Sequence, residues 1–352
     1  MKESIKNILE EISIGEFEDV KIGHAVNRDG MTGVTSIIFG DKAVAGVEIS
    51  GGGPASRETP LLDPKMACEN INCIVLSGGS AFGLEAGAGA AKWLEEQGIG
   101  FETGYGKVPL VCQSCIFDLS LGKNTVRPDV AMGYEACENA IVGNNQVGNI
   151  GGGIGASVGK LTKMCQSMKS GLGIHCVRLG NLKVAAIVVV NALGDIVDFD
   201  SGEKIAGMLT PDRKGYMDIE MTGYLGALEQ MKAGLKKDDM DKSLKEGEVA
   251  TERSTNTTIG AIITNADFSK GEMNKIAKMA TVAYSKCIRP SATTADGDSL
   301  YAVSVGNEKA DLNLVGMLSA RVMGEAIRKA VEESKMDENE YLDLCLEMGQ
   351  VK

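Results

Sequence analysis

Histidine, tryptophan and the other aromatic residues are scarce in this sequence, and their scarcity narrows the chemistry that the chain can perform. Only two histidines, His24 and His175, and one tryptophan occur, and aromatic residues make up 4% of the 352 residues. Catalytic machinery of the Ser-His-Asp or Cys-His type needs a histidine as its general base. We therefore interpret both histidines as structural residues and look for a different base.

Long apolar runs and a secretory leader are also missing. No stretch approaches the roughly 18 apolar residues of a membrane span, and residues 1–4 are not followed by the apolar core of a signal peptide. The nine cysteines are then expected to be reduced thiols in the cytoplasm. The formal net charge of −12 argues against a nucleic acid as partner, because phosphate binding requires an excess of Lys and Arg. We expect a cytoplasmic protein that binds neither membrane nor nucleic acid.

Two motifs suggest a cofactor, and both fail on spacing. Cys112 and Cys115 form a single Cys-x-x-Cys, whereas structural zinc needs four ligands and no second pair lies nearby. Residues 148–160 are rich in glycine, but Ile154 and Leu161 stand where a phosphate-binding loop needs Gly and Ser or Thr. We predict close backbone packing for this glycine-rich segment, and neither a metal nor a cofactor.

The sequence contains a succession of short apolar runs, turns and helical patterns that is typical of an α/β protein. A chain of this length can bury a large core as one big domain or two. A glycine-rich loop at 50–59 could leave backbone N–H groups without hydrogen-bond partners. Periodicity predicts β structure over 18–50, strands at 71–76, 184–190, 258–264 and 300–305, and helices up to about 98 and over about 217–235, 269–288 and 311–334.

The central feature is the boundary between a polar segment and a buried strand. Residues 236–256 form a charged linker with almost nothing to fill a core, and an apolar, β-branched run starts directly after Asn256. This is the layout of an N-terminal nucleophile hydrolase, in which the Thr257 hydroxyl attacks the Asn256 carbonyl and water then releases a new N-terminus. A Thr-Thr pair that opens a strand is also ordinary β structure, so the interpretation depends on the neighbouring motifs.

Other side chains could complete such a site, and each has a plainer interpretation. Asn191 follows the apolar strand at 184–190, where its amide could donate to an oxyanion or simply form a turn. Asp296 and Asp298 share one face if the chain is extended there. They could equally be solvated carboxylates of an Asp-Gly turn.

Taken together, these motifs resemble the self-processing L-aminopeptidase/D-esterase family, which includes β-peptidyl aminopeptidases and nylon-oligomer (aminohexanoate-oligomer) endo-hydrolases. The resemblance runs in order from about residue 18 to 335, and the Asn-Thr cut with the Asp-Gly-Asp turn is most similar to the nylon-oligomer branch. The matching segments are 52–59 (GGPASRET), 77–84 (SGGSAFGL), 169–173 (KSGLG), 189–192 (VVNA), 256–258 (NTT) and 296–298 (DGD).

The resemblance implies a four-layer α/β/β/α sandwich, a single domain over 1–352. It implies self-cleavage into fragments 1–256 and 257–352, which stay together and assemble as a tetramer of cleaved pairs. It also implies the roles of site residues, with Tyr134 and Lys169 lining the site: Thr257 as nucleophile, Asn191 as oxyanion donor, and Asp296 and Asp298 as residues that position and charge-balance the nucleophile.

Two amines could serve as the base that activates the Thr257 hydroxyl. A free α-amine titrates near ~8 and a lysine near ~10.4, so the new N-terminus of Thr257 needs less tuning at neutral pH than Lys169. We therefore favour the α-amine as base, with Lys169 near the nucleophile or the developing oxyanion.

Several functions are compatible with this sequence. The first is an amide hydrolase that acts on linear oligoamides, such as nylon-type oligomers, or on short peptides. The second is an aminopeptidase restricted to free N-termini. A third is acyl transfer of the kind performed by self-cleaving ornithine acetyltransferases, although their extended Thr-rich cleavage motif is not seen here. The non-enzymatic alternative is an uncleaved protein that binds a small ligand with its glycine-rich loops.

Overall fold

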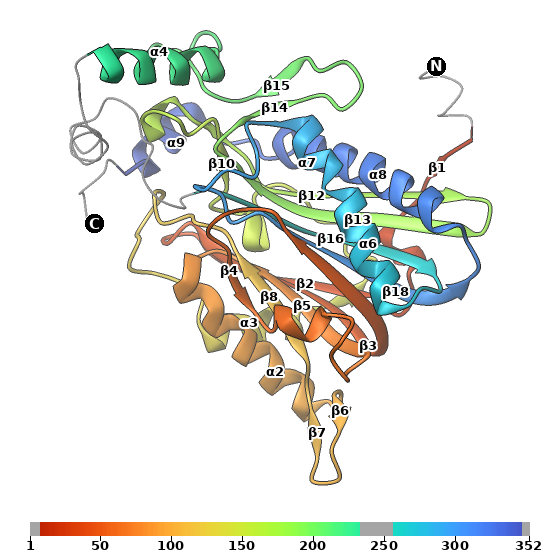
Figure 1. Ribbon diagram of the computed structural model, residues 1–352. Coiled ribbons are helices and arrows are strands. Elements are labelled where there is room, and N and C mark those ends of the chain that lie inside the picture. The colour runs from red at the N-terminus through yellow and green to blue at the C-terminus, as the bar shows by residue number, and fades with distance from the viewer. Residues whose placement is uncertain (1–7, 233–255, 347–352) are drawn as a thin grey trace.

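The computed structural model describes residues 8–232 and 256–346, which form two sheet layers between two layers of helices (Figure 1). Within these residues, eleven strands belong to one hydrogen-bonded sheet, ordered β1-β12-β13-β16-β18-β3-β5-β8-β4; β2 also pairs with β3, and β9 pairs with β2. These strands are β1 (Glu10–Glu11), β2 (Lys21–Asn27), β3 (Thr32–Ile49), β4 (Ala55–Arg57), β5 (Asn70–Ser77), β8 (Val111–Cys115), β9 (Ile141–Val142), β12 (Leu172–Leu179), β13 (Leu182–Asn191), β16 (Thr257–Ala266) and β18 (Ser299–Glu308).

The two sheet layers are halves of this one sheet, because β3 belongs to both. The first part of β3 pairs with β2 and β5, and its last part pairs with β18; the register against β5 shifts between Ile38 and Ala43. Ile37 and Ile74 of one half and Ile187 and Ile259 of the other are completely buried in the same apolar cluster. Burial of such side chains stabilises the fold by about 1.5–3 kcal/mol each. The predicted α/β/β/α sandwich is confirmed, with its two β layers joined through β3.

Helices cover the outer faces of both halves. In Figure 1, α6 and α8 lie over the half that contains β12, β13, β16 and β18, while α2 and α3 lie over the half that contains β2, β3, β5 and β8. The α-helices are α2 (Ala86–Glu96), α3 (Val130–Glu138), α4 (Ile219–Lys232), α6 (Lys270–Ala280), α7 (Val282–Cys287), α8 (Leu312–Glu332) and α9 (Glu338–Leu344).

Short elements complete the described chain. They are the strands β6 (Phe101–Glu102), β7 (Lys107–Val108), β10 (Ser157–Val158), β11 (Met168–Lys169), β14 (Asp195–Val197), β15 (Lys204–Ala206) and β17 (Ile288–Arg289), and the 3-10 helices η1 (Ile14–Glu16), η2 (Thr59–Leu62), η3 (Ser80–Glu85), η4 (Gly151–Gly153) and η5 (Met164–Gln166). The long helix predicted over 269–288 is divided at Thr281 into α6 and α7.

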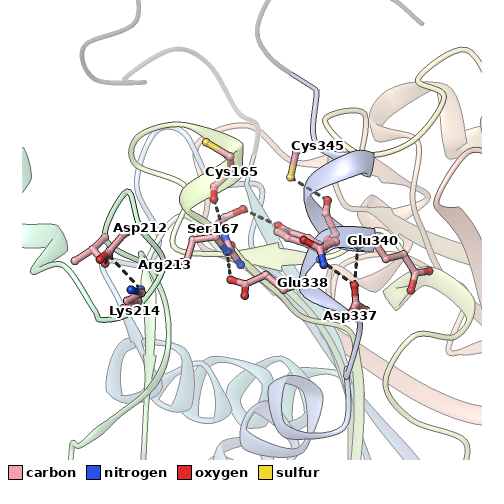
Figure 2. Close-up of polar contacts among 12 residues, drawn as sticks. Cys165, Ser167, Asp212, Arg213, Lys214, Asp337, Glu338, Glu340 and Cys345 are labelled. Carbon is pink, nitrogen blue, oxygen red and sulfur yellow. Dashed lines mark hydrogen bonds and ion pairs between the residues drawn. The ribbon is translucent and has the colours of Figure 1, made fainter.

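A polar cluster fastens α9 to the body of the protein. Figure 2 shows Arg213 between Glu338 of α9 and the backbone carbonyls of Cys165 and Ser167. The Ser167 and Tyr341 hydroxyls lie 2.6 Å apart, and Tyr341 is buried. These contacts hold the C-terminal helix against the segment that leads into β11.

Three strand ends meet at one place in the sheet. Asn191, the last residue of β13, lies opposite Thr257, the first residue of β16, in the antiparallel ladder. The parallel neighbour β18 begins at Ser299, immediately after the Asp296-Gly297-Asp298 turn. None of the described helices is long and apolar enough to cross a membrane. The predicted linker 236–256 lies outside the described residues except for Asn256.

Candidate active site

Thr257 is buried at the start of β16 and directly contacts the peptide bond before it. Its hydroxyl donates a hydrogen bond to the carbonyl oxygen of Asn256. The backbone N–H of Gly297 donates to the same carbonyl oxygen at 2.9 Å. An N–H aimed at a carbonyl oxygen stabilises negative charge that develops there during nucleophilic attack. The Thr257 hydroxyl and the Asn256 carbonyl therefore lie together, and two hydrogen bonds polarise this carbonyl.

Asn191 is held in one orientation by contacts to both ends of its side-chain amide. Its Oδ1 accepts from the Ser157 backbone N–H at 3.1 Å and from Lys160 Nζ at 2.8 Å, and its Nδ2 donates to the Phe117 carbonyl at 2.8 Å. Because donors surround Oδ1, the amide cannot flip without losing these bonds. An amide nitrogen carries two N–H groups, so Nδ2 keeps a second N–H beyond the one given to Phe117.

The Asp296-Gly297-Asp298 turn uses its carboxylates to organise the backbone around Thr257. Asp298 accepts from the backbone N–H of Thr258 at 2.6 Å and of Ala292 at 3.1 Å. Asp296 accepts from the backbone N–H and the hydroxyl of Thr293 at 2.8 and 2.6 Å. Both carboxylates are buried, so the solvated turn is excluded. Burial, together with the neighbouring charge of Asp296, raises the pKa of Asp298.

Glycine at position 297 is required by the proximity of the Thr257 hydroxyl. A Cβ there would lie 2.8 Å from Thr257 Oγ1 and 2.9 Å from the Gly53 carbonyl oxygen. The glycine-rich loop packs closely on the same turn, because the Gly53 N–H donates to the Asp296 carbonyl at 2.9 Å and the Gly52 N–H donates to the Thr293 carbonyl at 3.1 Å. These two amides support the turn and are not bare.

The lysine in contact with Asn191 is Lys160, which the sequence analysis did not identify. Lys160 is buried, and its Nζ donates to Asn191 Oδ1 and to the Asn191 backbone carbonyl at 2.9 Å. Burial lowers the pKa of Lys160 to about 7, against the opposing charges of Asp296, Asp118 and Asp298. The segment 148–160 does pack closely, as predicted: a Cβ on Gly152 would lie 2.5 Å from the Leu76 carbonyl oxygen. The sequence signal that could have identified Lys160 is its position as a lone lysine at the end of the glycine-rich segment 148–160.

Lys169 is also buried, but its described contacts are with backbone carbonyls. Its Nζ donates to the carbonyls of Ala156 at 3.0 Å, Gly153 at 3.3 Å and Ser170. Burial lowers the pKa of Lys169 to about 7, opposed by the charge of Asp118. The contacts thus give Lys169 a supporting position behind the segment that carries Ser157 and Lys160.

Tyr134 lies in the outer helical layer. Its hydroxyl donates to Glu96 at the end of α2 at 2.6 Å, and Lys92 lies 5.6 Å from the centre of its ring. The contacts of Tyr134 that the structure describes therefore join α3 to α2 and do not include Thr257, Asn191 or the two aspartates.

The cysteines and histidines occupy structural positions within the described residues. Cys112 and Cys115 are buried in β8, and burial raises the pKa of each thiol to about 12. His24 Nδ1 lies 3.0 Å from the Thr35 hydroxyl, and His175 Nδ1 lies 3.4 Å from Glu11. In the part of the chain that the structure covers, no three His, Cys, Asp or Glu side chains gather as metal ligands would.

Comparisons with other sequences agree on one family. A model of that family, described as peptidase family S58, matches residues 13–338. A protein of Mycobacterium leprae named as an uncharacterized aminopeptidase is 32% identical over 310 residues, covering 84% of this chain and 78% of its own length. A 6-aminohexanoate-oligomer endohydrolase of Paenarthrobacter ureafaciens is 30% identical over 331 residues, covering 90% of this chain and 84% of its own length.

Solved structures show the same fold. The L-aminopeptidase D-Ala-esterase/amidase of Ochrobactrum anthropi, described as a variant of the Ntn hydrolase fold, superposes with a TM-score of 0.64 at 14% identity, covering 93% of this chain and 92% of its own. A β-aminopeptidase of Burkholderia sp. superposes with a TM-score of 0.62 at 16% identity, covering 94% and 92%. With this fold, and with a sequence match over almost its whole length, the chain belongs to peptidase family S58 and is a hydrolase of amide bonds.

Proposed function

We propose that the chain cuts itself between Asn256 and Thr257 and that the new N-terminal Thr257 is the nucleophile of the mature enzyme. In the first step, Thr257 Oγ1 bonds to the Asn256 carbonyl carbon and the C–N bond breaks, so the peptide becomes an ester with a free α-amine. Water then hydrolyses the ester and releases fragments 1–256 and 257–352. The observation that carries this proposal is the contact of the Thr257 hydroxyl with the Asn256 carbonyl, whose oxygen also accepts the Gly297 N–H at 2.9 Å.

Turnover of a substrate repeats this chemistry with the free α-amine as base. The amine takes the proton of Thr257 Oγ1 while the oxygen attacks the substrate amide carbonyl, and the leaving amine departs with a proton. Asn191 Nδ2 donates to the oxyanion, as its fixed orientation allows. Water then cleaves the acyl-enzyme and regenerates Thr257.

The charged groups around Thr257 have two functions in this mechanism: the lysine favours the neutral α-amine, and the aspartates stabilise the ammonium. Lys160, in its charged form, holds Asn191 and favours the neutral, basic form of the nearby α-amine. Asp298 accepts the Thr258 N–H and, with Asp296, stabilises the ammonium that forms when the α-amine takes the proton. Lys169 supports the backbone behind Lys160.

We propose linear oligoamides, of the nylon type or short peptides, as substrates. The support is the 30% identity to a 6-aminohexanoate-oligomer endohydrolase over 90% of the chain. An aminopeptidase restricted to free N-termini is the second candidate, and it is supported by the 32% identity to a protein named as an aminopeptidase. The tetramer of cleaved pairs, the cytoplasmic location and a role of Tyr134 in substrate binding stay predictions.

A pair of matched substrates separates the two candidates. A 6-aminohexanoate trimer with a free amine and the same trimer with an acetylated amine differ only at the N-terminal end. An oligoamide hydrolase cleaves both at similar rates, because its site accepts internal amide bonds. An aminopeptidase cleaves only the free trimer, so a rate on the acetylated trimer that is lower by a factor of about 100 or more would reject the first candidate.

A further inference from the structure

A third buried carboxylate, Asp118, lies behind the candidate site and belongs to none of the motifs above. Its Oδ2 accepts from the Thr32 hydroxyl at 2.6 Å and its Oδ1 accepts from the Gly79 backbone N–H at 2.7 Å. Only 1% of the residue is exposed. A carboxylate that is buried this deeply persists only when it is hydrogen-bonded and faces positive charge.

Two glycines, Gly78 and Gly155, pack directly against this carboxylate. A Cβ on Gly78 would lie 1.8 Å from Asp118 Oδ2, and a Cβ on Gly155 would lie 2.6 Å from Asp118 Cβ. A side chain at 78 would therefore collide with Asp118, and one at 155 would collide first with the Met31 carbonyl oxygen, 2.0 Å from its Cβ, and then with Asp118. The absence of a side chain at Gly78 thus leaves room for the Asp118 carboxylate.

Asp118 connects the two segments that orient Asn191. One segment contains Phe117, its chain neighbour, whose carbonyl accepts Asn191 Nδ2 at 2.8 Å. The other begins at Gly155, on which Asp118 packs, and carries the Ser157 N–H and the Lys160 ammonium that hold Asn191 Oδ1. Each end of the Asn191 amide is thus bound by a chain segment that Asp118 belongs to or packs against.

Asp118 is also the negative charge that Lys160 and Lys169 share. The charges of Asp296, Asp118 and Asp298 favour the charged form of Lys160 and so oppose the lowering of its pKa, and the charge of Asp118 does the same for Lys169. Among the described residues, the titratable groups that interact electrostatically with Asp118 are these two lysines and the neutral thiol of Cys115. Asp296 and Asp298 belong to the turn beside Thr257, and Asp118 supplies the one opposing charge that comes from outside this turn.

We propose that Asp118 is a positioning residue of the amide hydrolase, which holds Lys160 charged and the Asn191 amide aligned without touching the substrate. The inference rests on the proposed function, in which a charged Lys160 orients the oxyanion donor. Removal of the Asp118 charge lets Lys160 lose its proton more easily, so the mature enzyme loses activity at a lower pH.

The test compares pH profiles of wild type and Asp118→Asn on the acetylated and free trimers. Asparagine keeps the volume and both hydrogen bonds, because its Oδ1 can accept the Gly79 N–H while the Thr32 hydroxyl turns to accept its Nδ2. We expect kcat to fall by about tenfold and KM to stay within about twofold. We also expect the alkaline limb of the pH profile, where kcat falls as the pH rises, to move down by about one pH unit. An alkaline limb at the wild-type position would overturn the proposal.

Two further variants make the result specific. Asp195→Asn removes a different buried carboxylate, which accepts the Met208 N–H at 2.8 Å and pairs with Lys204, and it should leave the alkaline limb unchanged. Thr32→Val removes one donor to Asp118 and disfavours its charged form, so its limb should lie between those of wild type and Asp118→Asn. If Asp118→Asn does not fold, the Thr32→Val variant provides the test. An alkaline limb of Thr32→Val at the same pH as in wild type then overturns the proposal. A wild-type protein that neither cuts itself nor hydrolyses either trimer instead rejects the proposed function.

Discussion

The backbone N–H of Gly297 lies 2.9 Å from the carbonyl oxygen of Asn256, the oxygen that the Thr257 hydroxyl also contacts. Two donors therefore converge on the carbonyl of a single peptide bond at the start of a buried strand. A threonine that opens a strand has no need for such an arrangement, whereas a bond that breaks by internal attack does.

Gly297→Ala tests this geometry directly. A methyl group at 297 would meet Thr257 Oγ1 at 2.8 Å and the Gly53 carbonyl oxygen at 2.9 Å, so the hydroxyl or the turn must move. We expect slower self-cleavage and an accumulation of the uncut 37.0 kDa chain on a denaturing gel. The matched control is Gly271→Ala in α6, where a Cβ would meet no described atom within 4 Å and cleavage should stay complete. Equal cleavage in both variants would contradict the arrangement.

Asn191→Ala should lower kcat by about 10²–10³, the usual effect of losing one oxyanion donor. The reason is that Asn191 Nδ2 is the proposed donor, which the Phe117 carbonyl holds in place while Ser157 and Lys160 bind the amide oxygen. Steady-state kinetics on an oligoamide measure the effect. If kcat were unchanged, the oxyanion would have to be stabilised elsewhere.

The two lysines should differ in their effect on turnover. Lys160→Met removes the cation that donates to Asn191, so we expect kcat to fall on the order of 10². Lys169→Met removes bonds to the backbone carbonyls of Gly153, Ala156 and Ser170, so we expect a loss of no more than about tenfold. The same kinetic assay compares the two variants, and a larger loss for Lys169→Met would reverse the assignment.

The pH profile of kcat should be a narrow bell. In the proposed mechanism Asp298 is ionised, and because its pKa is raised, activity should disappear as the pH falls through the neutral range instead of near 4. Lys160 has to be charged, and because its pKa is lowered to about 7, activity also disappears as the pH rises, well below the ordinary lysine range. Rates measured from about pH 5 to 9 test both limbs. A flat profile over this range would mean that neither group titrates in the active enzyme.

The sequence predicted the parts of the fold that depend on local pattern. The apolar run at 184–190 and the β-branched run after Asn256 became β13 and β16, and the amphipathic stretch near 311–334 became α8, because strand and helix periodicity follow from which side chains are buried. The local sequence pattern does not determine which residues lie opposite one another in paired strands. That Asn191 lies opposite Thr257 depends on the pairing of β13 with β16, which is a tertiary property.

Residues that act through long-range contacts escaped the sequence analysis. Lys160 lies 31 positions before Asn191, and Asp118 is 42 positions before Lys160, so no spacing rule joins them. Tyr134, placed at the site by the family resemblance alone, contacts Glu96 on α2 through its hydroxyl. The division of one long strand between two sheet layers was equally hidden, because β3 reads as a plain run of β-branched residues and glycine turns.

The most direct test of the central claim is the intact mass of the purified protein, combined with N-terminal sequencing. We predict two fragments whose masses sum to the 37.0 kDa chain plus one water, with the smaller beginning Thr-Thr-Ile-Gly at position 257. The Thr257→Ala variant should give one uncut chain and no hydrolysis of oligoamides. An uncut wild-type chain that still hydrolyses amides, or a Thr257→Ala variant that yields the same two fragments, would contradict the account.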